Sequence, residues 1–272
     1  MSRLTRWLRS RKANRPTPYE HLRRAPRYET QTIQLCGNDF RVADGPSFCA
    51  NYREIFQDEL YRFRSSTAAP LIVDCGANCG VSVVYFKKIY PRARIIAVEA
   101  DPHIFSLLDW NVARHGFTGV TLLNQAIAAG CESVTFHCQG ADAGRIHKMP
   151  SARTQCTVPA IELDDLLTEP VNLLKIDIEG AESDAICSSQ RLGAAAQVFC
   201  EYHSFVDGPQ SLHPMLAKLS ESGFRYYMHT QFCAKRPLIE DNCHLGMDLQ
   251  VNVFAKRVAS AEDRRHSDAA AA

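Results

Sequence analysis

The chain has 272 residues, of which 46% are hydrophobic and 22% charged, and its formal net charge is +1. This balance is typical of one globular domain with short appendages, and it excludes a disordered chain or one that coats nucleic acid through excess positive charge. Without a bilayer-spanning apolar run or a secretory signal, we expect a soluble, cytoplasmic protein. The eleven cysteines form no CxxC pair, which predicts reduced structural thiols.

The first 27 residues differ from the rest of the chain in charge. They contain nine Lys or Arg and a single acid, Glu20, and three prolines interrupt any long helix. We expect residues 1–27 to form a basic flexible arm, although the first eleven could instead form an amphipathic helix that makes weak contact with a membrane surface. At the other end, residues 258–272 lose all apolar periodicity, which predicts a disordered tail.

Residues 28–66 precede the first strongly apolar strand and are expected to cap one edge of the domain. A strand is predicted at Thr32–Leu35 and a helix at Asn51–Phe63. Three aromatic residues recur at helical spacing in the second segment, which indicates a packed helix face: Tyr52, Phe56 and Phe63.

Residues 67–257 alternate β-rich runs with helical stretches, a pattern typical of a parallel sheet with helices on both faces. The predicted strands are Leu71–Val73, Arg94–Val98, Val120–Leu123, Leu173–Ile176 and Val198–Tyr202. The predicted helices are Val81–Ile89, Ile104–His115 and Gly208–Ser222, closed by Pro91, Gly116 and Gly223.

Two pairs of segments depart from this alternation. Ser133–Cys138 and Thr154–Ile161 are predicted to be strands of an antiparallel flap or sheet extension. Arg225–Thr230 and Leu249–Ala255 are separated by a polar loop without helical periodicity, so we expect the sheet to close with an antiparallel pair.

A turn rich in glycine follows the first core strand. It begins at Asp74, contains Gly76, Asn78 and Gly80, and leads directly into a helix. Such a turn lets the backbone approach a ligand, and its free N–H groups favour an anion. A dinucleotide fingerprint needs glycine where Asn78 and Val81 stand, which favours S-adenosylmethionine over a dinucleotide. We expect the loop N–H groups to meet the methionine carboxylate, and Asp74 to accept from its ammonium or to order the turn.

Polar residues also follow the second and third strands. Glu99 stands where an acid can accept hydrogen bonds from both ribose hydroxyls. Asp101 precedes Pro102 and is expected to cap the next helix while lying in the cofactor site. Gln125 and Ala126 are predicted to lie beside the adenine.

Four titratable residues follow the next two strands. Asp177 and Glu179 come after Leu173–Ile176, and Glu201 and His203 end the following strand, so all four should meet at the carboxyl edge of the sheet. Such a cluster requires a cation, a hydroxyl-rich substrate or shared protons. We favour His203 as the general base, oriented by Glu201 or Glu179, over a histidine that is merely hydrogen-bonded at a strand end. Alternatively, Asp177, Glu179 and Glu201 hold a magnesium ion.

Taken together, five motifs resemble the FkbM family of S-adenosylmethionine-dependent methyltransferases, over roughly residues 50–256. They are VDCGANCG (73–80), VEADP (98–102), LDDLL (163–167), LKIDIEGAE (174–182) and CEYH (200–203). The resemblance implies a Rossmann-like, seven-stranded methyltransferase sheet and methyl transfer to a hydroxyl of a sugar, glycan or small metabolite. It also places four residues in the cofactor site and two near the transferred methyl group: Asp74, Gly76, Gly80 and Glu99, then Asp177 and Glu179.

Two other functions share this architecture, namely an NAD(P)-linked oxidoreductase and a non-catalytic cofactor-binding module. Nucleic acid is disfavoured as a partner, because the body has no basic stripe with interleaved aromatic residues. The NPPY-type turn of amino-methylating enzymes is also missing after Leu173–Ile176, which favours an oxygen acceptor. Two loops are expected to shape the acceptor pocket, Gly140–Pro150 and Gln231–Met247.

Overall fold

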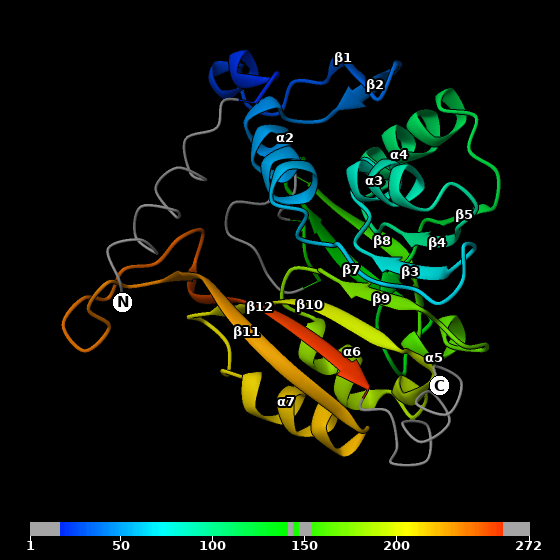
Figure 1. Ribbon diagram of the computed structural model, residues 1–272. Helices are drawn as coiled ribbons and strands as arrows, with labels where there is room; N and C mark the ends of the chain where they lie inside the picture. The colour runs from blue at the N-terminus through cyan, green and yellow to red at the C-terminus, as the bar shows by residue number, and fades with distance from the viewer. Residues whose placement is uncertain (1–16, 141–143, 147–153, 258–272) are drawn as a thin grey trace, which may run out of the picture.

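A computed structural model describes residues 17–140, 144–146 and 154–257 and places a seven-stranded sheet at the centre of the protein (Figure 1). The strand order is β11-β12-β10-β9-β3-β4-β5. The strands are β3 (Leu71–Cys75), β4 (Arg94–Val98), β5 (Val120–Leu123), β9 (Leu173–Ile176), β10 (Gln197–Phe205), β11 (Phe224–Cys233) and β12 (Met247–Arg257). Only β12 runs antiparallel to its neighbours, so the predicted mostly parallel sheet with a closing antiparallel pair is confirmed.

Helices cover both faces of this sheet (Figure 1). They are α3 (Val81–Ile89), α4 (Pro102–Arg114), α5 (Leu163–Leu166), α6 (Glu182–Ser188) and α7 (Leu212–Glu221), with a 3-10 turn at Leu192–Ala194. Because side chains alternate along a strand, Ile72 packs with α3 and α4 whereas Val73 packs with α5, α6 and α7. Helix α7 begins later than the predicted Gly208, since β10 continues to Phe205 and Gly208 donates from a turn to the Phe205 carbonyl (3.1 Å).

The cap contains a helix whose predicted bounds, Asn51–Phe63, are wrong at both ends. Helix α2 (Gly45–Tyr52) begins earlier because the Asp44 side chain accepts from the Ser47 amide at 2.9 Å and caps it. It continues into a single π-helical turn, Arg53–Gln57, and then stops. The predicted aromatic face does pack, with the rings of Tyr52 and Phe56 stacked and those of Phe56 and Tyr85 edge to face, and with Phe63 against Phe86.

The cap is attached to helix α4 through an antiparallel hairpin of β1 (Gln31–Leu35) and β2 (Asn38–Val42). The second of these strands was not predicted. Asn111 of α4 joins the hairpin through both ends of its side-chain amide, which accepts from the Arg41 N–H at 2.7 Å and donates to the Arg41 carbonyl at 2.8 Å.

The described part of the basic arm lies against this cap. A short 3-10 helix (Glu20–Arg24) buries Leu22, and Arg27 pairs with Asp44 at 2.7 Å. The expectation of an arm that stands apart is therefore wrong for residues 17–27, because Leu22 belongs to the core. The amphipathic helix expected earlier in the arm and the tail at 258–272 lie outside the described residues.

The predicted flap is a separate three-stranded sheet in the order β6-β8-β7. Strands β7 (Ser133–Cys138) and β8 (Thr154–Ile161) pair antiparallel as expected, and the short β6 (Ala126–Ile127), which was not predicted, joins β8. Most of the loop Gly140–Pro150 lies outside the described residues. Within the described ranges, no helix has the length and apolar character needed to span a membrane.

Candidate active site

A cavity of about 460 Å³ lies at the carboxyl ends of β3, β4, β9 and β10. The cap contributes Asn51 and Glu54 to its wall, the end of β11 contributes Gln231 and Phe232, and the loop before β12 contributes His244 and Leu245. The predicted loop Gln231–Met247 therefore does help to shape the cavity. The sheet edge supplies the remaining polar lining, which includes Gly76, Asn78, Glu99, Asp177, Glu179, Glu201, His203 and Gln250.

The two glycines of the turn between β3 and α3 have different roles. Gly76 has a φ of +82°, and a Cβ there would lie 1.8 Å from the carbonyl oxygen of Asp177. Only glycine allows this approach between two neighbouring turns of the site. Gly80 instead allows helix α4 to pack closely, because its Cβ would lie 2.8 Å from Leu108, and it does not line the cavity.

The amide groups of this turn already have acceptors within the protein. Gly76 and Ala77 both donate to the Val98 carbonyl at 2.9 Å, and Asn78 donates to Glu99 at 2.9 Å. The amides of Cys79 and Gly80 donate within the turn itself. The expectation that these N–H groups meet a ligand carboxylate is therefore wrong.

Asp74 is fully buried and orders the turn. Its carboxylate accepts from the Ser82 hydroxyl at 2.6 Å and lies 3.1 Å from the Lys175 ammonium. Because Asp74 is fully buried among these partners, its predicted role in ordering the turn is confirmed, and its predicted contact with the cofactor ammonium is wrong. Burial opposes the charge on Lys175, but the carboxylates of Asp74 and Asp177 outweigh it and raise the lysine pKa. Sequence reasoning missed Lys175, although a lysine inside the apolar strand β9 is the signal that marks it.

Glu99 lies at the centre of the predicted cofactor site. Its carboxylate accepts from the Asn78 amide at 2.9 Å and from the Asp101 amide at 2.8 Å, and burial raises its pKa to about 7. Asp101 itself caps α4 by accepting from His103 and Ile104, as predicted. Its side chain therefore faces the helix, and only its backbone amide serves the site.

A second cavity of about 40 Å³ lies beyond Glu99. It is lined by Gln125 and Ala126, the two residues that the sequence predicts to lie beside an adenine. Phe136 of the flap and Ile146 form another part of the wall, and neither was predicted. Apolar side chains on both sides of a narrow space suit a flat aromatic ring.

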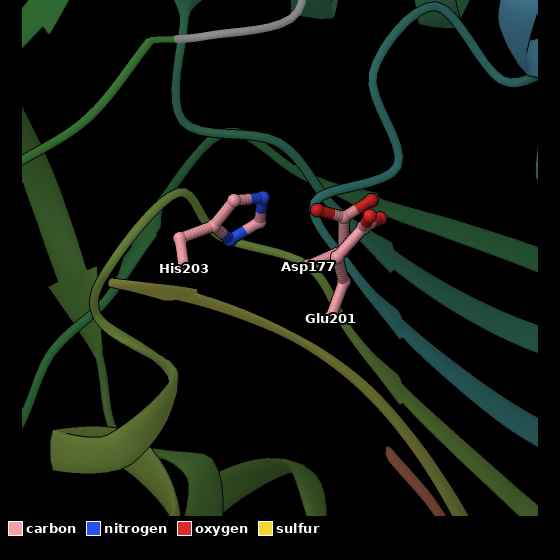
Figure 2. Close-up of side chains that lie close together, drawn as sticks. All are labelled: Asp177, Glu201 and His203. Atoms are coloured by element: carbon pink, nitrogen blue, oxygen red, sulfur yellow. The ribbon is translucent and has the colours of Figure 1, made fainter. Parts of the chain in front are cut away.

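The four predicted acceptor-site residues do come together. Figure 2 shows Asp177, Glu201 and His203, whose potential ligand atoms lie within 4.8 Å of one another. Glu179 lies 3.8 Å from His203 Nε2, and its φ of +56° places a non-glycine residue in the left-handed region. Backbone strain of this kind is concentrated at functional sites.

His203 is oriented by Glu182, which sequence reasoning did not single out. His203 Nδ1 lies 2.9 Å from the Glu182 carboxylate, which also accepts from the amides of Ile178 and Gly180. The expected orienting residues, Glu201 and Glu179, are therefore replaced by an acid in the first turn of α6. Although burial opposes the charge, the nearby Glu179 and Glu182 raise the pKa of His203 well above its ordinary value.

The pKa of Glu201 is also shifted by its surroundings. Burial and the charge of Asp177 raise it to about 8, which favours the protonated form. Gln250 donates to Glu201 at 2.6 Å and lies 3.4 Å from His203 Nε2. Gln250 was also missed, because only the antiparallel register of β10 and β12 places it opposite His203.

The sheet order, the acid after the second strand and the cavity at the carboxyl edge define a Rossmann-like methyltransferase fold. The Methyltransferase FkbM domain matches residues 74–226, which is more than half of the chain. The protein belongs to this family of methyltransferases.

Two named relatives and one solved structure are similar to this chain. Methyltransferase 1 of Beauveria bassiana is 30% identical over 189 residues, covering 57% of this chain and 74% of the relative. The 31-O-demethyl-FK506 methyltransferase FkbM of Streptomyces tacrolimicus is 25% identical over 211 residues, covering 64% and 80%. The crystal structure of methyltransferase FkbM from Methylobacillus flagellatus KT has a TM-score of 0.45 and 16% identity, covering 73% of this chain and 46% of that one.

Proposed function

We propose that the protein is an S-adenosylmethionine-dependent O-methyltransferase that acts on a hydroxyl of a sugar, glycan or small metabolite. The observation that carries this proposal is one cavity that joins Glu99 to His203 and its acids. The residues fit the cofactor, because an apolar cavity suits adenine and Glu99 can accept from ribose hydroxyls. When bound, the cofactor would supply an electrophilic methyl group on a positively charged sulfur, a charge that the surrounding carboxylates favour.

In this mechanism His203 takes the proton of the acceptor hydroxyl. Because Glu182 holds Nδ1, the other ring nitrogen, Nε2, faces the cavity. With the cofactor bound, the cavity would hold the acceptor hydroxyl close to the methyl group, and positioning of this kind supplies much of the rate enhancement. Nε2 of His203 would then accept the proton that the hydroxyl loses as its oxygen takes the methyl group. This requires neutral His203, so activity should rise as the pH increases through its raised pKa.

A divalent cation is a second candidate for activating the hydroxyl. The observation that favours it is the group of three possible metal ligands in Figure 2, Asp177, Glu201 and His203. His203 takes the place of Glu179, which was the predicted third ligand. Two carboxylates and an imidazole can bind Mg²⁺ or Mn²⁺, which would lower the pKa of a bound hydroxyl. If His203 alone removes the proton, EDTA should leave turnover unchanged. Loss of turnover in EDTA and its recovery with Mg²⁺ would assign activation to the cation.

Calorimetry tests the cofactor assignment. We expect S-adenosylhomocysteine to bind in the micromolar range and NAD to show no binding. The opposite result would favour an oxidoreductase and contradict the proposal. With a panel of sugar and polyketide hydroxyls, transfer of a labelled methyl group should produce an ether, and binding without any transfer would indicate a non-catalytic module.

The role of His203 is tested by substitution. His203→Ala should lower turnover at saturating acceptor by about 10²–10⁴-fold while S-adenosylhomocysteine binds as before, since only the proton acceptor is lost. Near-full turnover in this variant would remove His203 from the mechanism.

A further inference from the structure

A further cavity of about 600 Å³ lies at the edge of the sheet opposite the candidate active site, and we call it the amino-edge cavity. Gln197 starts β10 and Lys256 lies near the end of the antiparallel β12, so both stand at the amino end of the parallel strands. Ile89 and Tyr90, at the end of α3, form another part of the wall. None of the described residues that line this cavity also lines the candidate active site, so the two are separate.

The charged lining of the amino-edge cavity is positive. Arg62, Arg64 and Lys256 line it, and its described lining residues include no aspartate or glutamate. Arg62 pairs with Glu59 at 2.9 Å, but an exposed pair of this kind contributes little. Within the described ranges, neither Arg64 nor Lys256 forms an ion pair. The cavity therefore has positive charge that the described part of the protein does not neutralise.

Arg225 adds another positive charge beside this cavity. In the antiparallel register of β11 and β12, Arg225 lies directly opposite Lys256, and both residues are exposed. Directly opposed residues share one face of a sheet, and like charges at such positions destabilise the pair of strands. A bound anion would remove this repulsion, so the arrangement favours a negatively charged ligand.

The backbone that carries the two arginines is held in place. Phe63, which separates them in the chain, is buried, and its ring packs against Tyr90 with the centroids 5.0 Å apart. The Tyr90 hydroxyl donates to the Phe63 carbonyl at 3.2 Å. The Gln197 side-chain amide donates to the Arg64 carbonyl at 2.8 Å. The cations are thus attached to an ordered frame, beside an apolar wall of Ile89 and Tyr90.

This combination of charge, size and apolar surface suits an organic diphosphate. A guanidinium group can bind two phosphate oxygens at once, and an ammonium group binds phosphate as a point charge. Because a diphosphate carries more than one negative charge, it can neutralise several cations. Small-molecule sites have volumes of about 300–1,000 Å³, a range that includes this cavity.

We propose that the amino-edge cavity binds an organic diphosphate, such as a nucleoside diphosphate. Arg64 and Lys256 bind its phosphate groups, with Arg225 beside them, and Ile89 and Tyr90 contact its organic part. The site is distinct from the cavity proposed for methyl transfer, and this inference does not depend on the proposed function.

Calorimetry on the full chain tests this inference. Uridine diphosphate should bind, pyrophosphate should bind more weakly because it lacks the organic part, and uridine should not bind because it lacks the phosphates. Lys256→Gln and Arg64→Gln should each weaken uridine diphosphate by about tenfold, because each removes a charge-assisted hydrogen bond. As a matched control, Lys235→Gln makes the same change at an exposed position of the loop before β12 and should leave the affinity unchanged.

Four outcomes would overturn the inference. They are no binding of either diphosphate compound, equal affinity for uridine diphosphate and pyrophosphate, equal weakening by all three substitutions, and binding to vesicles that contain phosphatidylserine without binding to uridine diphosphate. The last result would assign the cations to a membrane surface.

Binding of S-adenosylhomocysteine separates this inference from the proposed function. Its affinity should be the same in Lys256→Gln as in the unmodified protein, because the two sites share no lining residue among those described. Loss of both ligands in that variant would show a general effect on the fold and overturn the role of Lys256. If the unmodified protein binds uridine diphosphate but not S-adenosylhomocysteine, the proposed function fails and the inference stands.

Discussion

The cavity has a cofactor half around Glu99 and an acceptor half around His203, and the two halves are stabilised by different kinds of contact. In the cofactor half, backbone amides make the decisive hydrogen bonds, as when Asn78 and Asp101 donate to Glu99. In the acceptor half, the hydrogen bonds join two side chains. His203 pairs with Glu182, and Glu201 accepts from the side-chain amide of Gln250. The first half depends mainly on the path of the chain, and the second on the charge states of its members.

This difference has a consequence for how each half responds to change. Backbone amides keep their positions when a neighbouring side chain is replaced, so Glu99 should titrate largely by itself. Glu179, Glu182, Glu201 and His203 each alter the charge that the others experience, so a substitution at one should shift the pKa of another. Four experiments test this contrast, beginning with the largest expected effect.

The first experiment removes the ammonium that lies between the two halves. Lys175→Met leaves the buried carboxylate of Asp74 without its counter-ion, which should lower the free energy of unfolding by about 3–5 kcal/mol, as measured by urea denaturation. Arg94→Gln is the control, because it breaks an exposed pair with Glu169 and should leave the midpoint unchanged within error. Similar midpoints for both variants would show that Lys175 is not the counter-ion that Asp74 requires.

The second experiment addresses the acceptor half alone. Glu182→Gln should lower kcat by about 100-fold, the lower end of a general base's contribution, because His203 loses both its orientation and a stabilising charge. The KM for the cofactor should change little, since Glu99 is not involved. Asp184→Asn, on the exposed side of the same helix, provides the control. A large rise in cofactor KM without a fall in kcat would mean that the two halves are not separate.

The third experiment concerns Glu99, the acid at the centre of the predicted cofactor site. The ionised carboxylate is the better acceptor for ribose hydroxyls, and the pKa of Glu99 is raised to about 7. Affinity for S-adenosylhomocysteine should therefore increase by about tenfold as the pH rises from about 6 to about 8, in proportion to the ionised fraction. Glu99→Gln should bind more weakly and show no such dependence in the same calorimetric series. A pH response that persists in this variant would come from another group.

The smallest expected effect is a shift in the pKa of His203 when the charge of Glu179 is removed. Glu179 favours the protonated form of His203, so Glu179→Gln should lower the His203 pKa, as followed by NMR of the imidazole in the free protein. Asp207→Asn changes an exposed acid of the turn after β10 and should leave this titration unchanged. An unaltered His203 titration in Glu179→Gln would contradict the coupling assigned to the acceptor half.

Much of the fold could be predicted because its patterns are local. The strand β4 and the helix α3 have the bounds that apolar runs and a terminal Pro91 indicate, and Glu99 stands at a strand end that topology brings to the sheet edge. The cap was predicted less well. Its helix begins where the Asp44 side chain accepts from the Ser47 amide, and the unpredicted strand β2 pairs with β1 and bonds to Asn111 of α4.

By itself, the sequence determined which chemical groups stand at the carboxyl edge of the sheet, because parallel strands end at the same side and turns follow them directly. The tertiary structure decided which of those groups contact one another. Glu182 orients His203, Lys175 neutralises Asp74, and the register of β12 places Gln250 beside Glu201. These pairings join segments distant in the chain, and their energies depend on burial, which no local pattern specifies. Only in three dimensions does Glu54 of the cap also reach the same cavity.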